Sequence, residues 1–197
     1  MGRRILIIGG VAGGASVAAR ARRLDEHAEI IMFDKGPHVS FSNCALPFFL
    51  SRVVKNSDSL VMMSPEQFKK QYNIEARVNS EVLKINRKEK KIAVKNLVTG
   101  EEYEESYDKL VLSPGANPIL PQSIDGVTGA NVFTIRNVVD IRKLDSYIAE
   151  HDVRDVAVVG GGFIGVEIAE NLRLAGKNVS LIEALDQIMA PFDYDMA

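Results

Sequence analysis

One pattern occurs twice in this chain: a short apolar run, a cluster of glycines and a stretch of helix-forming residues. The first copy reads "RILIIGGVAGGASVAARARRL" over residues 4–24, and the second reads "VAVVGGGFIGVEIAENLRL" over residues 156–174. In each copy another apolar run follows and ends in an acid, Asp34 in one and Glu183 in the other. Strand, glycine loop, helix and strand in this order predict a βαβ unit with parallel strands. We therefore expect an α/β protein with two nucleotide-binding units.

The region between the two copies predicts smaller elements. Ser64 and Pro65 fit the start of a helix that runs to about Tyr72, because serine caps helices and proline is tolerated in the first turn. The other predicted elements are antiparallel strands of a β-hairpin layer over residues 74–98 with a turn at Thr99-Gly100, a buried strand over residues 107–115 and an amphipathic helix over residues 137–150.

The composition is that of an ordinary globular protein. The chain has 197 residues, of which 46% are hydrophobic, and 26 acidic residues offset 24 basic residues to give a formal net charge of -2. Such a balance provides no basic surface for nucleic acid. The apolar run near the start is too short for a secretion signal. We therefore expect a cytoplasmic protein that binds neither nucleic acid nor a membrane.

The chain contains one cysteine, Cys44, which excludes an internal disulfide and any multi-cysteine metal site. The three histidines, His27, His38 and His151, fall in predicted turns or loops. We therefore expect no metal site.

The second glycine cluster matches the dinucleotide-binding pattern Gly-x-Gly-x-x-Gly. Its first glycine makes a tight turn, its second lets the backbone approach a pyrophosphate, and its third allows the helix to pack closely on the strand. Glu183 can accept a hydrogen bond from a ribose 2′-hydroxyl and would repel a 2′-phosphate, so NADH is preferred over NADPH. The residues assigned to this NAD(P)H site are Gly160, Gly162, Phe163, Ile164, Gly165 and Glu183.

The first glycine cluster departs from this pattern, because Val11 stands where the middle glycine is expected. Taken alone, such a loop is as compatible with a plain turn as with a nucleotide site. Three features favour the nucleotide site: the flanking strand and helix, Asp34 at the end of the next strand, and the repeat of the whole unit. Two nucleotide sites in one chain suggest an enzyme that relays electrons.

This arrangement resembles the flavin-dependent pyridine nucleotide-disulfide oxidoreductases over essentially all 197 residues. The resemblance implies a Rossmann-like FAD-binding domain, with a parallel sheet, helices and a β-hairpin layer, at residues 1–150. The first part of a Rossmann-like NAD(P)H-binding domain would follow at residues 151–197. It also implies that this chain is a piece of a longer, homodimeric enzyme. The FAD contacts that it implies are Gly9, Gly10, Val11, Ala12, Gly13, Gly14, Asp34, Lys35, Val82, Ser113, Pro114 and Gly115.

Cys44 lies in the stretch "SFSNCALPFF", in which Pro47 is tolerated only in the first turn of a helix. We therefore expect Cys44 at a helix N-terminus, where free N–H groups stabilise a thiolate and lower its pKa. A lone cysteine is more often a small buried hydrophobe, but these surroundings favour a nucleophile. Most members of the family carry a second cysteine five positions later, where this chain has Phe49, so Cys44 must act on an external partner.

The same stretch resembles the single-cysteine branch of the family, the coenzyme A disulfide reductases and the NADH-dependent CoA-persulfide and polysulfide reductases. The resemblance implies that Cys44 is the redox nucleophile and forms a mixed disulfide with coenzyme A. Arg20 and Arg23, one helical turn apart, suit a polyanion such as coenzyme A, although a solvated helix face gives the same pattern. The CoA contacts that the resemblance implies are Ser16, Arg20, Arg23, Ser40, Asn43 and Tyr72.

Two other functions stay open at this point. One is an NADH oxidase or peroxidase, which also uses a single cysteine, cycled as a sulfenic acid. Peroxidases of that branch carry a histidine in the first glycine loop, where this chain has Val11 and Ala12. The other is a nucleotide-binding fragment without turnover.

Overall fold

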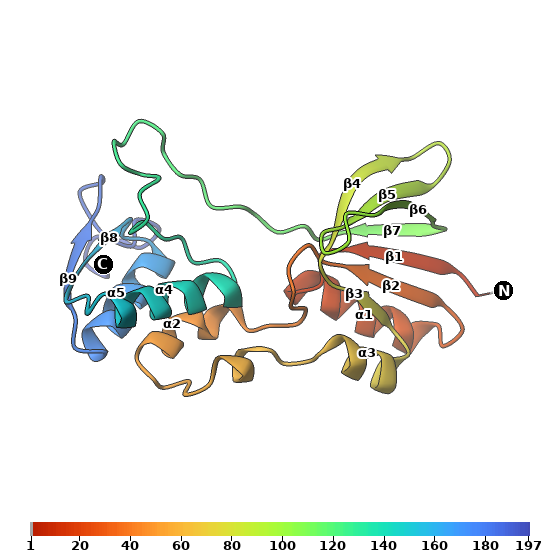
Figure 1. The fold of residues 1–197 in the computed structure, drawn as a ribbon, viewed down its shortest axis with the longest axis horizontal. Coiled ribbons are helices and arrows are strands. Elements are labelled where there is room, and N and C mark those ends of the chain that lie inside the picture. Colours follow the sequence, from red (N-terminus) through yellow and green to blue (C-terminus); the bar gives the residue numbers. More distant parts are fainter. Residues whose placement is uncertain (1) are drawn as a thin grey trace. The chain divides into compact units, whose positions relative to one another are not determined.

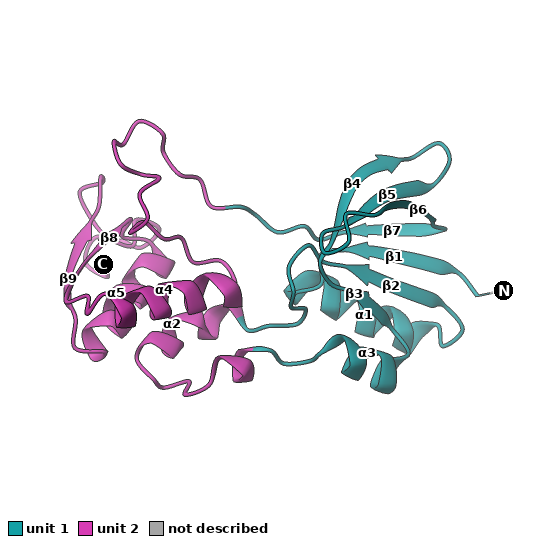
Figure 2. Cartoon of the chain, viewed as in Figure 1, with its two compact units in different colours: residues 1–42, 61–117 teal, residues 43–60, 118–197 magenta. Residues whose placement is uncertain are grey.

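The computed structural model describes residues 2–197, which form two compact units (Figure 2). Unit 1 comprises the chain up to Ser42 together with Val61–Asn117, and unit 2 comprises Asn43–Leu60 and Pro118–Ala197. These units follow packing and divide the chain differently from the domains 1–150 and 151–197, which the family resemblance implies and which stay a prediction.

Unit 1 is built around a parallel sheet of four strands in the order β3-β2-β1-β7 (Figure 1). The helices α1 and α3 cover one face of this sheet. The elements are β1 (Arg4–Ile8), α1 (Ala12–Leu24), β2 (Glu29–Phe33), α3 (Pro65–Tyr72), β3 (Glu75–Arg77) and β7 (Lys109–Leu112). The predicted βαβ unit at the start of the chain is therefore confirmed.

An antiparallel layer of three strands covers the other face of the sheet (Figure 1). Its strands are β4 (Ser80–Asn86), β5 (Lys91–Asn96) and β6 (Glu102–Ser106), with a register shift in β4 between Val82 and Lys84. This layer confirms the predicted β-hairpin layer.

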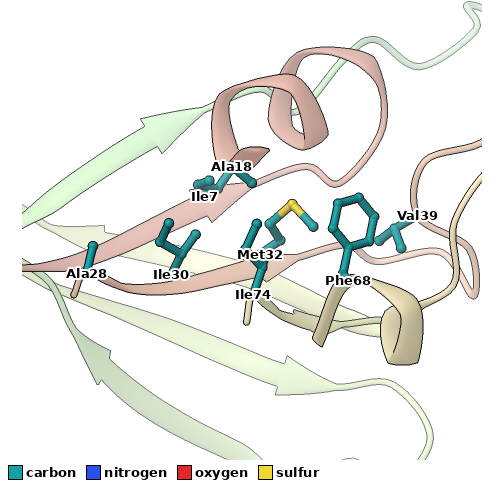
Figure 3. Close-up of a cluster of buried hydrophobic side chains, with 8 residues drawn as sticks. All are labelled: Ile7, Ala18, Ala28, Ile30, Met32, Val39, Phe68 and Ile74. Carbon is teal, nitrogen blue, oxygen red and sulfur yellow. The ribbon is translucent and has the colours of Figure 1, made fainter. Parts of the chain in front are cut away.

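The strand β2 shows why the parallel sheet needs cover on both faces. Its successive side chains alternate between two apolar clusters, with Ile30 and Met32 on one side and Ile31 and Phe33 on the other. The first cluster, under α1 and α3, also contains Ile7, Ala18, Ala28, Val39, Phe68 and Ile74 (Figure 3). The second cluster joins β1 and β2 to Ile92 and Val94 of β5.

Unit 2 contains the second βαβ pattern as a two-stranded parallel sheet with its crossover helix. Its main elements are α4 (Val138–Glu150), β8 (Asp155–Val159), α5 (Phe163–Leu174) and β9 (Asn178–Ile182). Unit 2 also includes a short arm that leaves unit 1 after Ser42, and we call residues 43–60 the cysteine arm. The arm contains a 3₁₀ turn (Asn43–Ala45), α2 (Leu46–Leu50) and a second 3₁₀ turn (Ser57–Leu60).

Two predicted boundaries differ from the structure. Helix α1 begins at Ala12, inside the glycine cluster, rather than after the cluster, because the last residues of the cluster already adopt helical geometry. The strand predicted at residues 107–115 is limited to Lys109–Leu112 and is only partly buried, because β7 lies at the edge of the sheet. The predicted cap of α3 is present as a capping box between Ser64 and Gln67. Within the described residues, no helix is both long and apolar enough to span a bilayer.

Candidate nucleotide and thiol sites

The first glycine loop is shaped by three close contacts, two with backbone atoms and one with a side chain. Gly9 has φ 95°, and a Cβ atom there would overlap the carbonyl oxygen of Ser113. A Cβ on Gly14 would overlap the carbonyl oxygen of Gly9, so α1 can pack this closely on β1 only with glycine at that position. A Cβ on Gly13 would lie 3.3 Å from the Ser113 hydroxyl oxygen. The predicted FAD residues Gly9, Gly13, Gly14 and Ser113 are thus brought together.

Asp34 closes this loop from the neighbouring strand. Its Oδ2 accepts a hydrogen bond from the Gly10 N–H at 2.9 Å, and its Oδ1 accepts one from the Gly36 N–H at 2.8 Å. On the other side of Gly10, its carbonyl oxygen accepts a hydrogen bond from the Ser40 N–H at 2.8 Å. The loop is therefore held in place by the residues that follow β2.

The loop lies where parallel α/β sheets bind ligands. It follows the carboxyl end of β1, whose neighbours β2 and β7 lie on opposite sides, so the strand order reverses there.

The other predicted FAD residues lie around this loop and beyond it. Val11 is the N-cap residue of α1, and Ala12 is the first residue of the helix. Lys35 is exposed, and its Nζ donates to Asn117 Oδ1 at 3.5 Å. Gly115, which follows Pro114, has φ 67°. Val82 packs on the second apolar cluster under the hairpin layer.

The second loop repeats this construction in unit 2. Gly160 has φ 105°, and a Cβ on Gly165 would overlap the carbonyl oxygen of Gly160, as Gly14 does with Gly9. Gly162, the N-cap of α5, differs because a Cβ there would meet no atom within 4 Å. Nothing in the described chain requires glycine at this position, and the open space is where the pattern expects a pyrophosphate. Phe163 and Ile164 form the exposed first turn of α5.

Glu183 plays the part of Asp34 in the second loop. Its Oε2 accepts from the Gly161 N–H at 2.6 Å, and its Oε1 accepts from the N–H groups of Leu185 at 3.0 Å and Ala184 at 2.7 Å. The hydrogen bonds from Leu185, Gly161 and Ala184 hold the pKa of Glu183 below its usual value of 4.5. The side chain therefore stays a carboxylate, which is the state that accepts from a ribose hydroxyl.

The repeat extends to residues that the sequence pattern did not indicate. The Met189 N–H donates to the Gly161 carbonyl at 2.7 Å, as the Ser40 N–H does to Gly10. Both donors have a left-handed backbone, with φ 51° at Met189 and 49° at Ser40. The residue before each donor blocks a side chain at the glycine: a Cβ on Gly10 would lie 2.5 Å from Val39 Cγ1. The matching distance for Gly161 is 2.8 Å to Ile188 Cγ2. The sequence did not indicate this part of the repeat, because the pairs Val39-Ser40 and Ile188-Met189 have in common only that the first residue is β-branched and apolar.

Cys44 is exposed and lies in the 3₁₀ turn Asn43–Ala45, which leads directly into α2. Pro47 occupies the first turn of α2, as expected. The prediction of a helix start is thus confirmed, although the α-helix itself begins two residues after the cysteine. Asn43, a predicted CoA contact, is exposed in the same turn.

The other predicted CoA contacts lie in unit 1. Ser16, Arg20 and Arg23 are exposed and share one face of α1, at positions i, i+4 and i+7. Arg22 has another task, since its guanidinium donates to the carbonyls of Tyr72, Asn73, Asp25 and Glu26. Tyr72 is half-buried against the first apolar cluster. Among residues 2–197, no group of three or more His, Cys, Asp or Glu is placed to hold a metal ion.

Comparison with known proteins identifies the family. The sequence profile described as pyridine nucleotide-disulphide oxidoreductase matches residues 3–197. The chain belongs to this family. Members of the pyridine nucleotide-disulphide oxidoreductase family use FAD and a pyridine nucleotide, which agrees with the two loops described above.

Three relatives within the family are closely similar. Coenzyme A disulfide reductase from Staphylococcus haemolyticus (strain JCSC1435) is 39% identical over 98% of this chain and 43% of its own length. The crystal structure of reduced Bacillus anthracis CoADR-RHD is 49% identical with a TM-score of 0.97, over 100% of this chain and 35% of its own. An NAD-dependent persulfide reductase from A. fulgidus is 32% identical with a TM-score of 0.90, over 95% of this chain and 34% of its own. This chain spans less than half of each relative.

A third solved structure bears on the choice of nucleotide. It is an engineered water-forming NADPH oxidase bound to NADPH, 26% identical with a TM-score of 0.90 over 98% of this chain and 42% of its own. Its five replacements include a glycine changed to alanine, an aspartate eighteen positions later changed to alanine, and the next residue, an alanine, changed to arginine.

Proposed function

We propose that this chain is the nucleotide-binding and thiol-bearing part of an FAD-dependent enzyme that uses NADH to reduce coenzyme A disulfide or CoA persulfide. The observation that carries the proposal is the exposed Cys44 at the start of a helix, in a chain with two dinucleotide loops. Relatives named as coenzyme A disulfide reductase and persulfide reductase support it. A cytoplasmic location and a homodimeric assembly belong to the same proposal.

The two loops would hold the two nucleotides. The first loop with Asp34 and the Ser113-Pro114-Gly115 segment would hold FAD, and the second loop with Glu183 would hold NADH. When bound, FAD supplies the means to pass an electron pair from a nicotinamide to sulfur. The chain's own part is to present N–H groups at the starts of α1 and α5 to the phosphates.

Cys44 would supply the nucleophile. Its thiolate attacks one sulfur of CoA disulfide, which forms a Cys44–S–S–CoA bond and releases one CoA thiolate. Two electrons from NADH then break the new disulfide, and the products are the second CoA thiolate, the Cys44 thiolate and NAD⁺ with one proton. With CoA persulfide, attack of the Cys44 thiolate on the outer sulfur breaks the S–S bond of the substrate, releases CoA thiolate and leaves a persulfide on Cys44. Two electrons from NADH then split this persulfide into the Cys44 thiolate and hydrosulfide.

The arginine face of α1 would bind the substrate. Coenzyme A carries several phosphate charges, and Arg20 and Arg23 offer guanidinium groups that pair with phosphates through two hydrogen bonds each. Arg22 donates to four carbonyl oxygens and therefore has a structural role. Of the three arginines on this part of α1, Arg20 and Arg23 are the two that would be available to a ligand.

The decisive experiment follows the mixed disulfide itself, because it needs neither flavin nor NADH. The chain is incubated with CoA disulfide, and its intact mass is measured with and without the Cys44→Ser replacement. We expect one CoA adduct in the unaltered chain and none in the variant, with FAD binding equal in both. An unaltered chain that gains no CoA would overturn the proposal.

The NADH oxidase function is the second candidate, favoured by the similarity to the oxidase-derived structure. In that case Cys44 would react with peroxide to form a sulfenic acid. Exposure of the chain to hydrogen peroxide, followed by a sulfenic-acid probe, distinguishes the two. A probe signal at Cys44 in a chain that gains no CoA would support the oxidase.

The preference for NADH is proposed from Glu183 and the residue after it. Glu183 stands eighteen positions after Gly165 and precedes Ala184, which is the spacing of the glycine, aspartate and alanine replaced in the NADPH oxidase. We expect Glu183→Ala with Ala184→Arg to bind NADPH more tightly than NADH, reversing the order in the unaltered chain. Titration of nucleotide fluorescence measures both affinities, and an unaltered chain that binds NADPH as tightly as NADH would refute the preference.

A further inference from the structure

Asn171 is a polar side chain with no exposed surface. It lies in α5 beside the buried Leu172 and one turn after the buried Ile168. Among residues 2–197 the only other buried polar side chain is Ser80. A leucine would be cheaper to bury at this position, so the amide must gain something from its partners.

The partners of Asn171 fix its orientation. Its Nδ2 donates to the carbonyl oxygen of Glu167 at 2.8 Å, one turn earlier in α5. A carbonyl can only accept, so the amide nitrogen must face Glu167 and the amide oxygen must face away from it. That oxygen, Oδ1, accepts a hydrogen bond from the hydroxyl of Ser51 at 2.6 Å.

Ser51 belongs to the cysteine arm. It is the C-cap of α2, the helix that begins immediately after the turn holding Cys44. Helix α2 packs against α4 and α5, and its buried side chains are Leu46, Pro47, Phe49 and Leu50. Apolar packing holds this helix on its neighbours, and the Ser51 hydrogen bond adds a directional contact to that packing.

We propose that Asn171 is a positioning residue that fixes the Cys44 turn on α5, the helix whose first turn follows the second glycine loop. This inference rests on the proposed role of Cys44 as the reacting thiol. The helix α5 thus has two tasks, with its N-terminus facing the nucleotide and its third turn holding the cysteine arm.

The other polar contacts of the arm are more exposed. Arg52 pairs with Asp145 of α4 through two hydrogen bonds at 2.8 and 3.1 Å, and the Arg52 and Asp145 side chains are 55% and 21% exposed. Arg142 of α4 donates to Ser57 at 2.7 Å and Asp58 at 2.6 Å, and the Asp58 side chain is 79% exposed. Exposed pairs contribute little, whereas a buried amide left without its partner is costly. The Asn171–Ser51 bond is therefore the contact that sets the position of α2.

The single cysteine makes the test direct, because a fluorescent maleimide labels Cys44 alone. Ser51→Ala removes the hydroxyl, and Ser51→Thr keeps it. We expect Ser51→Ala to lower the anisotropy of the label and to speed hydrogen exchange of the α2 amides by about tenfold. Ser51→Thr should retain the anisotropy of the unaltered chain.

Arg142→Ala is the matched control, because it loosens the same arm at its far end. It should lower the melting temperature without changing the anisotropy at Cys44, so a general loss of stability is distinguished from a loss of position. An unchanged anisotropy in Ser51→Ala would overturn the inference. The anisotropy of the label is measured without turnover. The test of position therefore gives a result even if Cys44→Ser shows that the thiol takes no part in CoA chemistry.

Discussion

Two glycines of the second loop differ in the space around them. Gly165 is surrounded by its own chain, since any Cβ there would overlap the Gly160 carbonyl, whereas Gly162 faces open space. The fold therefore requires glycine at position 165 but not at position 162, where we propose that a nucleotide phosphate approaches.

This difference predicts opposite effects of two equal substitutions. Gly165→Ala should destabilise the chain by about 1–3 kcal/mol, because backbone atoms must move to admit the methyl group. Gly162→Ala, at φ -77°, should change stability by less than about 0.5 kcal/mol yet weaken NADH binding about tenfold or more. Thermal unfolding and NADH titration measure the two effects. Undiminished NADH affinity in Gly162→Ala would mean that no phosphate approaches this loop.

Residue by residue, the sequence could predict what depends on local geometry. The glycine loops and the acids after β2 and β9 were predicted from their spacing and from the repeat, and the turn at Cys44 was predicted from Pro47. Asn171 could not be found in this way, because its importance depends on Ser51, which lies 120 positions earlier. A polar residue in a helix reads as solvent-facing until the helix is placed against its neighbours.

At the scale of elements, the hairpin layer is tied to the parallel sheet by charges as well as by its apolar face. Glu105 of β6 accepts from Arg4 of β1 and from Arg77 of β3, each at 2.5 Å, and its side chain is only 14% exposed. Burial alone would raise the pKa of Glu105, but the hydrogen bonds and charges of Arg77 and Arg4 outweigh it and hold the pKa below 4.5.

This network predicts a dependence of stability on pH. Because the pKa of Glu105 is lower in the folded chain, its contribution is present above the unfolded value and is lost as the pH falls through the folded value. Glu105→Gln should cost about 2 kcal/mol of unfolding free energy near neutral pH and much less in strong acid. Urea unfolding at several pH values measures this.

The neighbouring acid provides the control for that measurement. Glu104 pairs with Lys91 at 2.9 Å, but their side chains are 61% and 42% exposed. Glu104→Gln should therefore change stability by less than about 1 kcal/mol at any pH. Equal losses in the two variants would show that the Glu105 network adds nothing beyond ordinary surface pairing.

Elements themselves were predictable where local rules decide them. The capping box of α3 and the Asn137 cap of α4 appear where serine and asparagine precede a helix-forming run. The extent of β7 was not predictable, because its apolar residues suggest full burial, and only the strand order shows that it lies at an edge.

At the scale of the whole molecule, the chain uses one construction twice. In both units a strand ends in a glycine loop, and an acid closes the loop. In both, a residue with a left-handed backbone donates its N–H to a glycine carbonyl of the loop, Gly10 in the first and Gly161 in the second. The sequence predicted the glycine loops and the acids that follow them, because both recur at fixed spacing, but it did not predict that each acid closes its own loop. The left-handed donor depends on backbone conformation at Ser40 and Met189, which leaves no residue signature.

The closing of each loop by its own acid has a thermodynamic consequence. Gly10 and Gly161 donate hydrogen bonds to Asp34 and Glu183, so each loop is held in its shape by contacts within the chain. We therefore expect a nucleotide that binds either loop to lose little affinity to the cost of ordering a loose segment. A loop held in this way does not adapt its shape to a ligand, so we expect a ligand that does not fit it to bind weakly.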